Sequence, residues 1–161
     1  MLYTPALVVQ SIATFFFASP MRPSCLLDSL PENTPAPGGT GLDTWPTLLV
    51  VDSDPQMLGT LVCYFEKRGF HVAAGATLAE AKIFFQRRKS WALVIADYHL
   101  GDGTGWELCC WLRDQTATPP PFLLMSGSVR GEARATGLDF LAKPFPIAEL
   151  ETRVRTLLNR G

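Results

Sequence analysis

The sequence has no surplus of charge of either sign. Lysine and arginine together number 14 and aspartate and glutamate 15, which leaves a formal net charge of −1 over 161 residues. Without a basic excess, bulk electrostatics give no reason to expect binding to nucleic acid, and we predict none. Hydrophobic residues make up 47% of the chain and charged residues 18%, a balance that suits one globular domain with a sizeable core.

A long uninterrupted hydrophobic run is also missing. The most apolar stretch, residues 2–18, is broken by Gln10 and Ser11 and is too short and too mixed for a transmembrane helix. It also lacks the positively charged start of a secretory signal peptide. We therefore predict a cytoplasmic protein with no membrane partner.

Cysteine is sparse and is not arranged for metal binding. The chain has four cysteines, which form no CxxC pair and have no histidine at metal-ligand spacing. Two of them are adjacent in a predicted helix and are poor disulfide partners. We expect reduced thiols that serve as small hydrophobic side chains, as is usual in cytosolic proteins. The four are Cys25, Cys63, Cys109 and Cys110.

Residues 1–45 differ in composition from the rest of the chain. They hold six of the 13 prolines, and Arg22 is their one basic residue. Such a composition is typical of a linker, and Met21 is a second candidate start of translation. We predict a poorly ordered Pro/Gly-rich extension over residues 1–45 and one folded domain over residues 46–161.

From Thr47 onward, apolar strand patterns alternate with amphipathic helix patterns. Helix starts are marked by Asp54-Pro55 and by capping boxes that begin at Thr77 and Thr104. Continuous apolar strands that alternate with helices predict a parallel sheet covered on both faces. We expect strands at 47–51, 70–74, 91–96, 122–125 and 138–142, and helices that start near residues 55, 77, 104, 129 and 146.

Polar side chains follow four of these predicted strands. Asp52 and Asp54 follow the first strand, Asp97 ends the third, and Ser126 and Lys143 follow the fourth and fifth. Each alone could be an ordinary turn, cap or surface residue. Because the carboxyl ends of parallel strands meet at one edge of a sheet, the set together predicts a metal and phosphoryl site there.

This ordered set, on a pattern of five β/α units, resembles the receiver domain of two-component response regulators, of the chemotaxis-regulator type. The resemblance covers residues 47–160 and implies an α/β, doubly wound, flavodoxin-like (βα)5 fold. It implies that Asp97 takes a phosphoryl group from a phosphohistidine and forms an aspartyl phosphate. Lys143 and Ser126 would contact phosphoryl oxygens, so that catalysis rests on positioning and electrostatics.

The same resemblance implies a Mg²⁺ site. Asp52 and Asp97 would supply carboxylate oxygens and His99 its backbone carbonyl, which are ligands that Mg²⁺ prefers. Asp54 is a further candidate ligand, although its position after the strand favours a role as a helix cap.

The resemblance also implies a conformational switch. Ser126 would move toward the phosphoryl group while the ring of Phe140, at the aromatic switch position, turns inward. A core phenylalanine that never moves is an equally good reading of Phe140.

Three departures from the family pattern affect these expectations. Ser53 stands where the family has a second adjacent acid, so we expect weaker Mg²⁺ binding. Gly101 stands where the family often has proline, so we expect a looser loop after Asp97. The stretch between Ser126 and Lys143 is shorter than usual, so we expect a shortened fourth helix.

Three functions are compatible with this sequence. The first, which we favour, is a stand-alone receiver and not an enzyme. Its phosphoryl donor would be a histidine kinase or phosphotransfer domain. Because the sequence ends at Gly161 directly after the last helix, we expect its output to be contact with a downstream protein. The second is a degenerate receiver that binds proteins without being phosphorylated. The third is a phosphatase, because Asp52-Ser53-Asp54 resembles the DxD motif of haloacid-dehalogenase-type enzymes; Pro55 and the lack of an acidic pair after Lys143 count against it.

Overall fold

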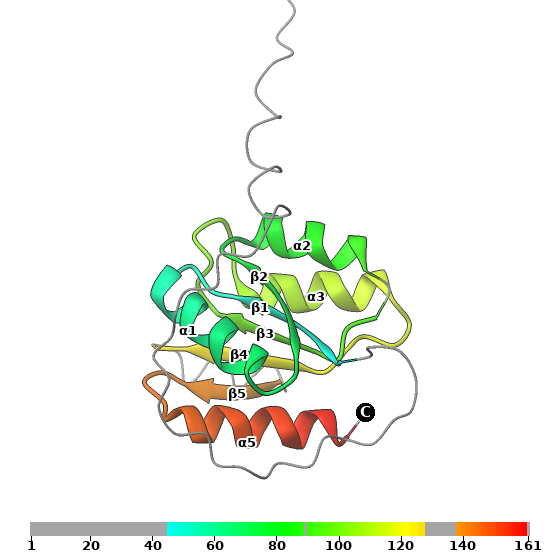
Figure 1. The fold of residues 1–161 in the computed structure, drawn as a ribbon. Coiled ribbons are helices and arrows are strands. Elements are labelled where there is room, and N and C mark those ends of the chain that lie inside the picture. The colour runs from blue at the N-terminus through cyan, green and yellow to red at the C-terminus, as the bar shows by residue number, and fades with distance from the viewer. Residues whose placement is uncertain (1–44, 89, 128–137, 161) are drawn as a thin grey trace, which may run out of the picture. The chain divides into compact units, whose positions relative to one another are not determined.

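The predicted parallel sheet is present in the computed structural model, which describes residues 45–88, 90–127 and 138–160. Its five strands pair in parallel in the order β2-β1-β3-β4-β5 (Figure 1). The α/β, flavodoxin-like prediction is therefore confirmed. The strands are β1 (Thr47–Val51), β2 (His71–Gly75), β3 (Leu93–Asp97), β4 (Phe122–Ser126) and β5 (Asp139–Ala142).

Four helices connect and cover these strands in the described part of the chain. Their starts agree with the sequence prediction to within one residue. The fourth predicted helix, near residues 129–136, lies outside the described residues. The helices are α1 (Pro55–Glu66), α2 (Leu78–Arg87), α3 (Gly105–Gln115) and α5 (Ile147–Leu158). Within the described ranges, none of them is long and apolar enough to cross a bilayer.

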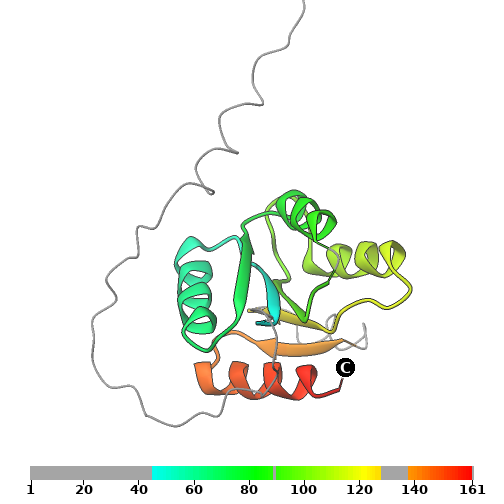
Figure 2. The same cartoon turned by 45° about the vertical axis from the view of Figure 1, so that its right-hand side comes forward.

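Side chains of the central strands alternate between two hydrophobic layers. Leu49 and Val51 of β1 pack in one layer with residues of α2 and α3, whereas Leu48 and Val50 pack in the other with residues of α1 and α5. Figure 2 shows the two helix pairs on opposite faces of the sheet. Because β1 is fully buried, its sequence is a continuous apolar run rather than an alternating one.

Side-chain caps fix the starts of α1, α2 and α3, whereas α5 begins after Pro146 without a side-chain cap. Thr104 forms a complete capping box with Glu107, as predicted. At α2, Thr77 accepts a hydrogen bond from the Glu80 N–H, but the Glu80 carboxylate reaches the N–H of Ala76 instead of closing the box. Thr77 follows β2 by two residues, whereas Thr104 follows β3 after a loop of six residues, so both loops lie at the carboxyl ends of the strands.

Close packing at the start of α3 ties that helix to β3. A Cβ added to Gly105 would meet the backbone carbonyl oxygen of Asp97 and the side chain of Leu124. We expect Gly105→Ala to lower the free energy of unfolding by about 2 kcal/mol, because an extra methyl here forces the backbone to shift. Urea unfolding measures this. Gly59→Ala is the control, since no atom lies within 4 Å of its added Cβ; an equal effect of the two substitutions would contradict the close approach.

Candidate functional site

The carboxylate of Asp52 lies fully buried at the end of β1. Its Oδ2 lies 2.6 Å from the Lys143 Nζ, and its Oδ1 accepts a hydrogen bond of 2.9 Å from the Asp54 N–H. A buried carboxylate needs such partners, because leaving its charge unpaired away from water is costly. Asp52 is thus held rigidly, with both oxygens engaged.

The carboxylate of Asp97 lies beside it at the end of β3. Val51 pairs with Ala96 in the sheet, so that the two acids follow each other across neighbouring strands. The Asp97 Oδ1 lies 3.3 Å from the Lys143 Nζ and accepts a hydrogen bond of 2.9 Å from the Tyr98 N–H. Its side chain is 14% exposed, against 0% for Asp52, and its Oδ2 receives no hydrogen bond from a described residue. Asp97 is therefore the more accessible of the two acids.

The surroundings of Asp97 favour its neutral form. Burial raises the pKa of Asp97 above its usual range, and the nearby charge of Asp52 acts in the same direction, while Lys143 opposes both. The site thus contains a carboxyl group with a perturbed pKa, as is frequent at functional sites.

Lys143 and Ser126 reach this edge from the two following strands. The Lys143 N–H donates to the Ser126 carbonyl oxygen at 2.8 Å, which fixes the lysine next to the end of β4. Ser126 is 1% exposed and lies one position beyond Met125, the strand partner of Asp97. The structure therefore brings Asp52, Asp97 and Lys143 into direct contact, with Ser126 on the adjoining strand end.

Asp54 does not face this group of charges. Its Oδ1 accepts hydrogen bonds from the N–H groups of Gln56 and Met57, which caps α1. The cap role that the sequence favoured is confirmed, and the role of Asp54 as a metal ligand stays a prediction. His99 is exposed, and its backbone carbonyl accepts a hydrogen bond of 3.1 Å from the Ser53 hydroxyl.

The loop after Asp97 is closed by its own hydrogen bonds. Leu100 and Gly103 are joined by a backbone hydrogen bond of 3.1 Å, and His99 pairs with Thr104 in an antiparallel bridge. Gly101 between them has φ of +74°, a conformation that proline cannot adopt because its ring holds φ near −65°. Glycine therefore permits a closed turn at this position, and the looser loop stays a prediction.

Asp102 attaches this loop to α2. Its two carboxylate oxygens accept hydrogen bonds of 2.7 and 3.0 Å from the N–H groups of Leu78 and Ala79, at the start of that helix. These hydrogen bonds lower the pKa of Asp102. The sequence analysis did not identify this residue. An acid next to Gly101 reads as an ordinary turn residue, and its partners lie 24 positions earlier in the chain.

We expect Asp102→Ala to lower the free energy of unfolding by about 1 kcal/mol, because the substitution removes a cap from α2. The loss should shrink below the normal pKa of an aspartate, since a carboxylate with a lowered pKa stabilises the folded state only while it is ionised. Urea unfolding at pH 7 and pH 3 tests both statements. The control is Asp114→Ala, which removes a carboxylate with no hydrogen bond among the described residues. An equal decrease in the free energy of unfolding for this control would contradict a stabilising role for the Asp102 hydrogen bonds.

The donor set of this edge fits Mg²⁺ with few protein ligands. Among the described residues, no group of three or more His, Cys, Asp or Glu side chains is gathered for a metal. However, Asp52 and Asp97 converge on one ammonium group, so both direct oxygens at the same small region. Mg²⁺ commonly uses one or two carboxylates and keeps several waters. The carboxylates of Asp52 and Asp97 are within that number of protein ligands.

Phe140 lies on β5, three residues before Lys143. It is partly buried and packs against the hydrophobic layer beneath α2 and α3. The Phe140 ring thus contacts the core rather than lying free on the surface.

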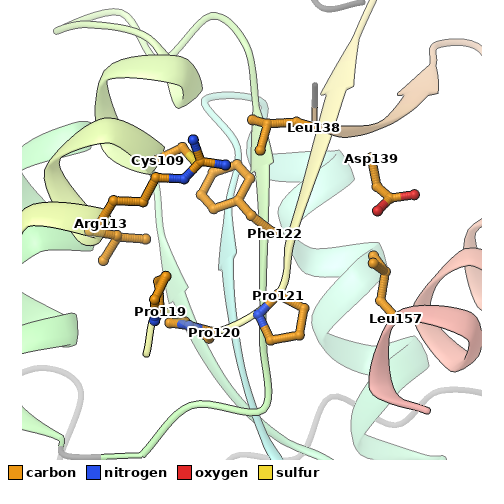
Figure 3. A pocket seen from close by; sticks show the side chains of 10 residues that line it. Cys109, Arg113, Pro119, Pro120, Pro121, Phe122, Leu138, Asp139 and Leu157 are labelled. Atoms are coloured by element: carbon orange, nitrogen blue, oxygen red, sulfur yellow. The ribbon is translucent and has the colours of Figure 1, made fainter. Parts of the chain in front are cut away.

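A hollow lies at the opposite end of the sheet, beside the amino ends of β4 and β5. Figure 3 shows its lining, in which Pro119, Pro120 and Pro121 precede β4 and Leu138 precedes β5. Its charged lining residues, Arg113 and Asp139, have opposite signs. The hollow is separate from the carboxylates at the strand carboxyl ends and provides no converging acids.

Comparison with known proteins identifies the kind of domain. A family model described as the response regulator receiver domain matches residues 48–155. The transcriptional regulatory protein GltR of Pseudomonas aeruginosa is 31% identical over 121 residues, which cover 71% of this chain and 50% of GltR. The transcriptional activator protein PfeR of the same organism is 36% identical over 123 residues, which cover 71% of this chain and 38% of PfeR. This chain thus spans half the length of these relatives, or less.

Solved structures agree with this result. The non-phosphorylated HemR receiver domain from Leptospira biflexa matches with a TM-score of 0.65 at 26% identity, covering 70% of this chain and 94% of that one. The receiver domain of the Francisella response regulator 1452 matches with a TM-score of 0.63 at 28% identity, covering 71% and 98%. The similarity covers nearly the whole of both receiver domains.

Proposed function

Because this chain belongs to the response regulator receiver domain family, we propose that it accepts a phosphoryl group on Asp97 from a phosphohistidine. A receiver is a signalling domain of two-component systems rather than an enzyme, and it implies a kinase as partner. Lys143, Ser126 and a bound Mg²⁺ would assist the transfer, and the phosphorylated domain would then contact a downstream protein.

One observation carries the proposal: a single ammonium group, that of Lys143, lies within 3.3 Å of two carboxylates, of which Asp97 is the accessible one. Asp52 is a poorer acceptor, because it is fully buried and both of its oxygens are engaged. Asp97 keeps 14% of its side chain exposed and is therefore the acid that a donor can reach.

The transfer breaks the phosphorus–nitrogen bond of the donor and forms a phosphorus–oxygen bond to a carboxylate oxygen of Asp97. The donor imidazole leaves with the electron pair. Asp52, Asp97 and the His99 carbonyl would hold Mg²⁺, whose charge offsets the repulsion between Asp97 and the phosphoryl oxygens. Lys143 gives up its contact with Asp97 and pairs with a phosphoryl oxygen, and the Ser126 hydroxyl donates to another.

The product acts by changing protein contacts. Ser126 would shift toward the phosphoryl group and Phe140 would follow, so that phosphorylation changes the populations of two states. The donor is a histidine kinase or phosphotransfer domain, and the recipient is a downstream protein. We place both events in the cytoplasm, with no membrane or nucleic acid bound by residues 46–161. The receiver match begins at residue 48, and the extension over residues 1–45 stays a prediction.

Incubation with a small acyl-phosphate donor and Mg²⁺ tests the proposal. We expect the intact mass to increase by one phosphoryl group, and we expect a chelator to reduce that increase. The label should be lost in mild base, because an acyl phosphate hydrolyses readily whereas a phosphoserine ester does not. Labelling that survives base treatment would contradict an aspartyl phosphate.

A degenerate receiver is the second candidate. Ser53 favours it, because the serine removes one negative ligand from the site. This alternative predicts no mass increase with the acyl-phosphate donor, while a downstream protein still binds. The phosphatase alternative is disfavoured, because it needs Asp54 as an acid and the Asp54 carboxylate caps α1.

A further inference from the structure

A side chain bridges the two loops that border the acidic site. The Ser53 hydroxyl, in the loop after β1, donates a hydrogen bond of 3.1 Å to the carbonyl oxygen of His99, in the loop after β3. The two residues are 46 positions apart and are both exposed. The hydrogen bond therefore joins two loops that lie far apart in the chain.

The acceptor of this hydrogen bond is one of the oxygens that the proposed function assigns to Mg²⁺. A carbonyl oxygen that accepts from a hydroxyl is partly compensated already and points a lone pair at that hydroxyl. A cation that uses the same oxygen must displace the hydroxyl or share the oxygen with it. Metal binding therefore costs part of a hydrogen bond that the protein has already made.

Ser53 also leaves the site with less negative charge. Asp52 and Asp97 carry two negative charges and Lys143 one positive charge, and the three groups are in contact. Their formal sum is −1, and Ser53 adds nothing to it. The attraction of the site for a divalent cation is correspondingly small.

We propose that Ser53 is the residue that limits the Mg²⁺ affinity of this site, by holding the His99 carbonyl in a hydrogen bond. The inference rests on the proposed function for the ligand set. Beyond that function, the Ser53 hydroxyl competes with the cation for the His99 carbonyl oxygen. Ser53 thus weakens Mg²⁺ binding by more than the absence of a negative charge.

Mg²⁺ titration of the unphosphorylated full chain tests this inference. Calorimetry, together with NMR shifts of the backbone amides of residues 97–99, reads out binding without any phosphoryl transfer. We expect Ser53→Ala to bind Mg²⁺ about fivefold more tightly than the natural chain, which is the change that the loss of one competing hydrogen bond of ordinary strength produces. We expect Ser53→Asp to bind at least about tenfold more tightly, because it adds a carboxylate ligand.

A matched control is Thr60→Ala. Thr60 is also exposed and also donates from a hydroxyl to a backbone carbonyl, that of Gln56 at 2.7 Å within α1. Its removal should leave Mg²⁺ affinity unchanged. Since Ser53 and Thr60 are exposed, both variants are expected to fold.

The outcomes separate the inference from the proposed function. If Ser53→Asp tightens binding but Ser53→Ala has the affinity of the natural chain, the hydroxyl does not compete and the inference is wrong, while the metal site stands. If Ser53→Ala weakens binding, the hydroxyl is itself a ligand and the inference is again wrong. If Ser53→Asp does not bind Mg²⁺, or if adding Asp52→Asn to it leaves Mg²⁺ affinity unchanged, the metal site of the proposed function fails.

Discussion

Replacing Asp97 with asparagine is expected to abolish labelling by an acyl-phosphate donor, to below about one hundredth of the level of the natural chain. The amide has nearly the shape of the carboxylate but lacks the nucleophilic oxygen that forms the phosphorus–oxygen bond. Asp52→Asn should retain detectable labelling at a reduced rate, because it removes one proposed metal ligand and leaves the acceptor in place. Intact mass after a fixed incubation measures both.

The stability of the Asp97 variant shows whether loss of labelling is a chemical effect. The pKa of Asp97 is raised in the folded chain, so its ionisation disfavours folding once the pH is above the aspartate reference value of 3.8. The stabilisation that protonated Asp97 gives the folded state is fully present below pH 3.8, and it is lost as the pH rises through the folded-state pKa of Asp97. Asp97→Asn should therefore have a higher free energy of unfolding than the natural chain at pH 7, and the difference should shrink toward pH 3.

The reverse labelling pattern would reject the assignment. If Asp52→Asn abolished the label and Asp97→Asn kept it, Asp52 would be the acceptor despite its burial. An Asp97 variant that was unlabelled and also unfolded at pH 7 would contradict the stated electrostatics of the site.

Replacing Lys143 with methionine is expected to lower the free energy of unfolding by about 3 kcal/mol. Methionine keeps most of the volume of the lysine stem but leaves the fully buried Asp52 carboxylate without its partner at 2.6 Å. Breaking a buried pair from one side costs much more than removing both charges. The double variant Lys143→Met with Asp52→Asn should therefore be more stable than Lys143→Met alone. Urea unfolding of the two single variants and the double variant measures this coupling.

A surface ion pair of the same protein provides the comparison. The Arg160 Nη1 lies 3.4 Å from the Asp139 Oδ2, and the arginine side chain is 63% exposed. Arg160→Met should cost less than about 1 kcal/mol, as is usual for exposed pairs. If Lys143→Met were no more destabilising than Arg160→Met, the charges at the sheet edge would not be coupled as the structure implies.

The regular elements of this domain could be predicted closely because their signals are local. The run Leu48-Leu49-Val50-Val51 is apolar throughout since both faces of β1 are buried, and Thr104 with Glu107 closes a capping box within four residues. The predicted strand at 70–74 is shifted by one residue from the observed β2, His71–Gly75, and the strand predicted from residue 91 begins at Leu93. β2 is an edge strand with only partial burial, so its pattern is less distinct.

The candidate site could be predicted in its members but not in its contacts. The order of Asp52, Asp97, Ser126 and Lys143 at successive strand ends follows from the sequence, because parallel strands place their carboxyl ends at one edge. Which acid is buried and which is accessible does not follow. Both come after similar apolar runs, and the difference in exposure, 0% for Asp52 and 14% for Asp97, exists only in the folded chain.

The amino-acid sequence by itself determined the secondary structure, the parallel sheet and the set of polar residues at its edge. These depend on side-chain periodicity and caps, which act over a few residues. Only the tertiary structure decided that Ser53 holds the His99 carbonyl, that Asp102 caps a helix 24 positions earlier, and that one lysine serves both acids. Such contacts depend on distances of a few ångströms between loops far apart in the chain, and no local pattern encodes them.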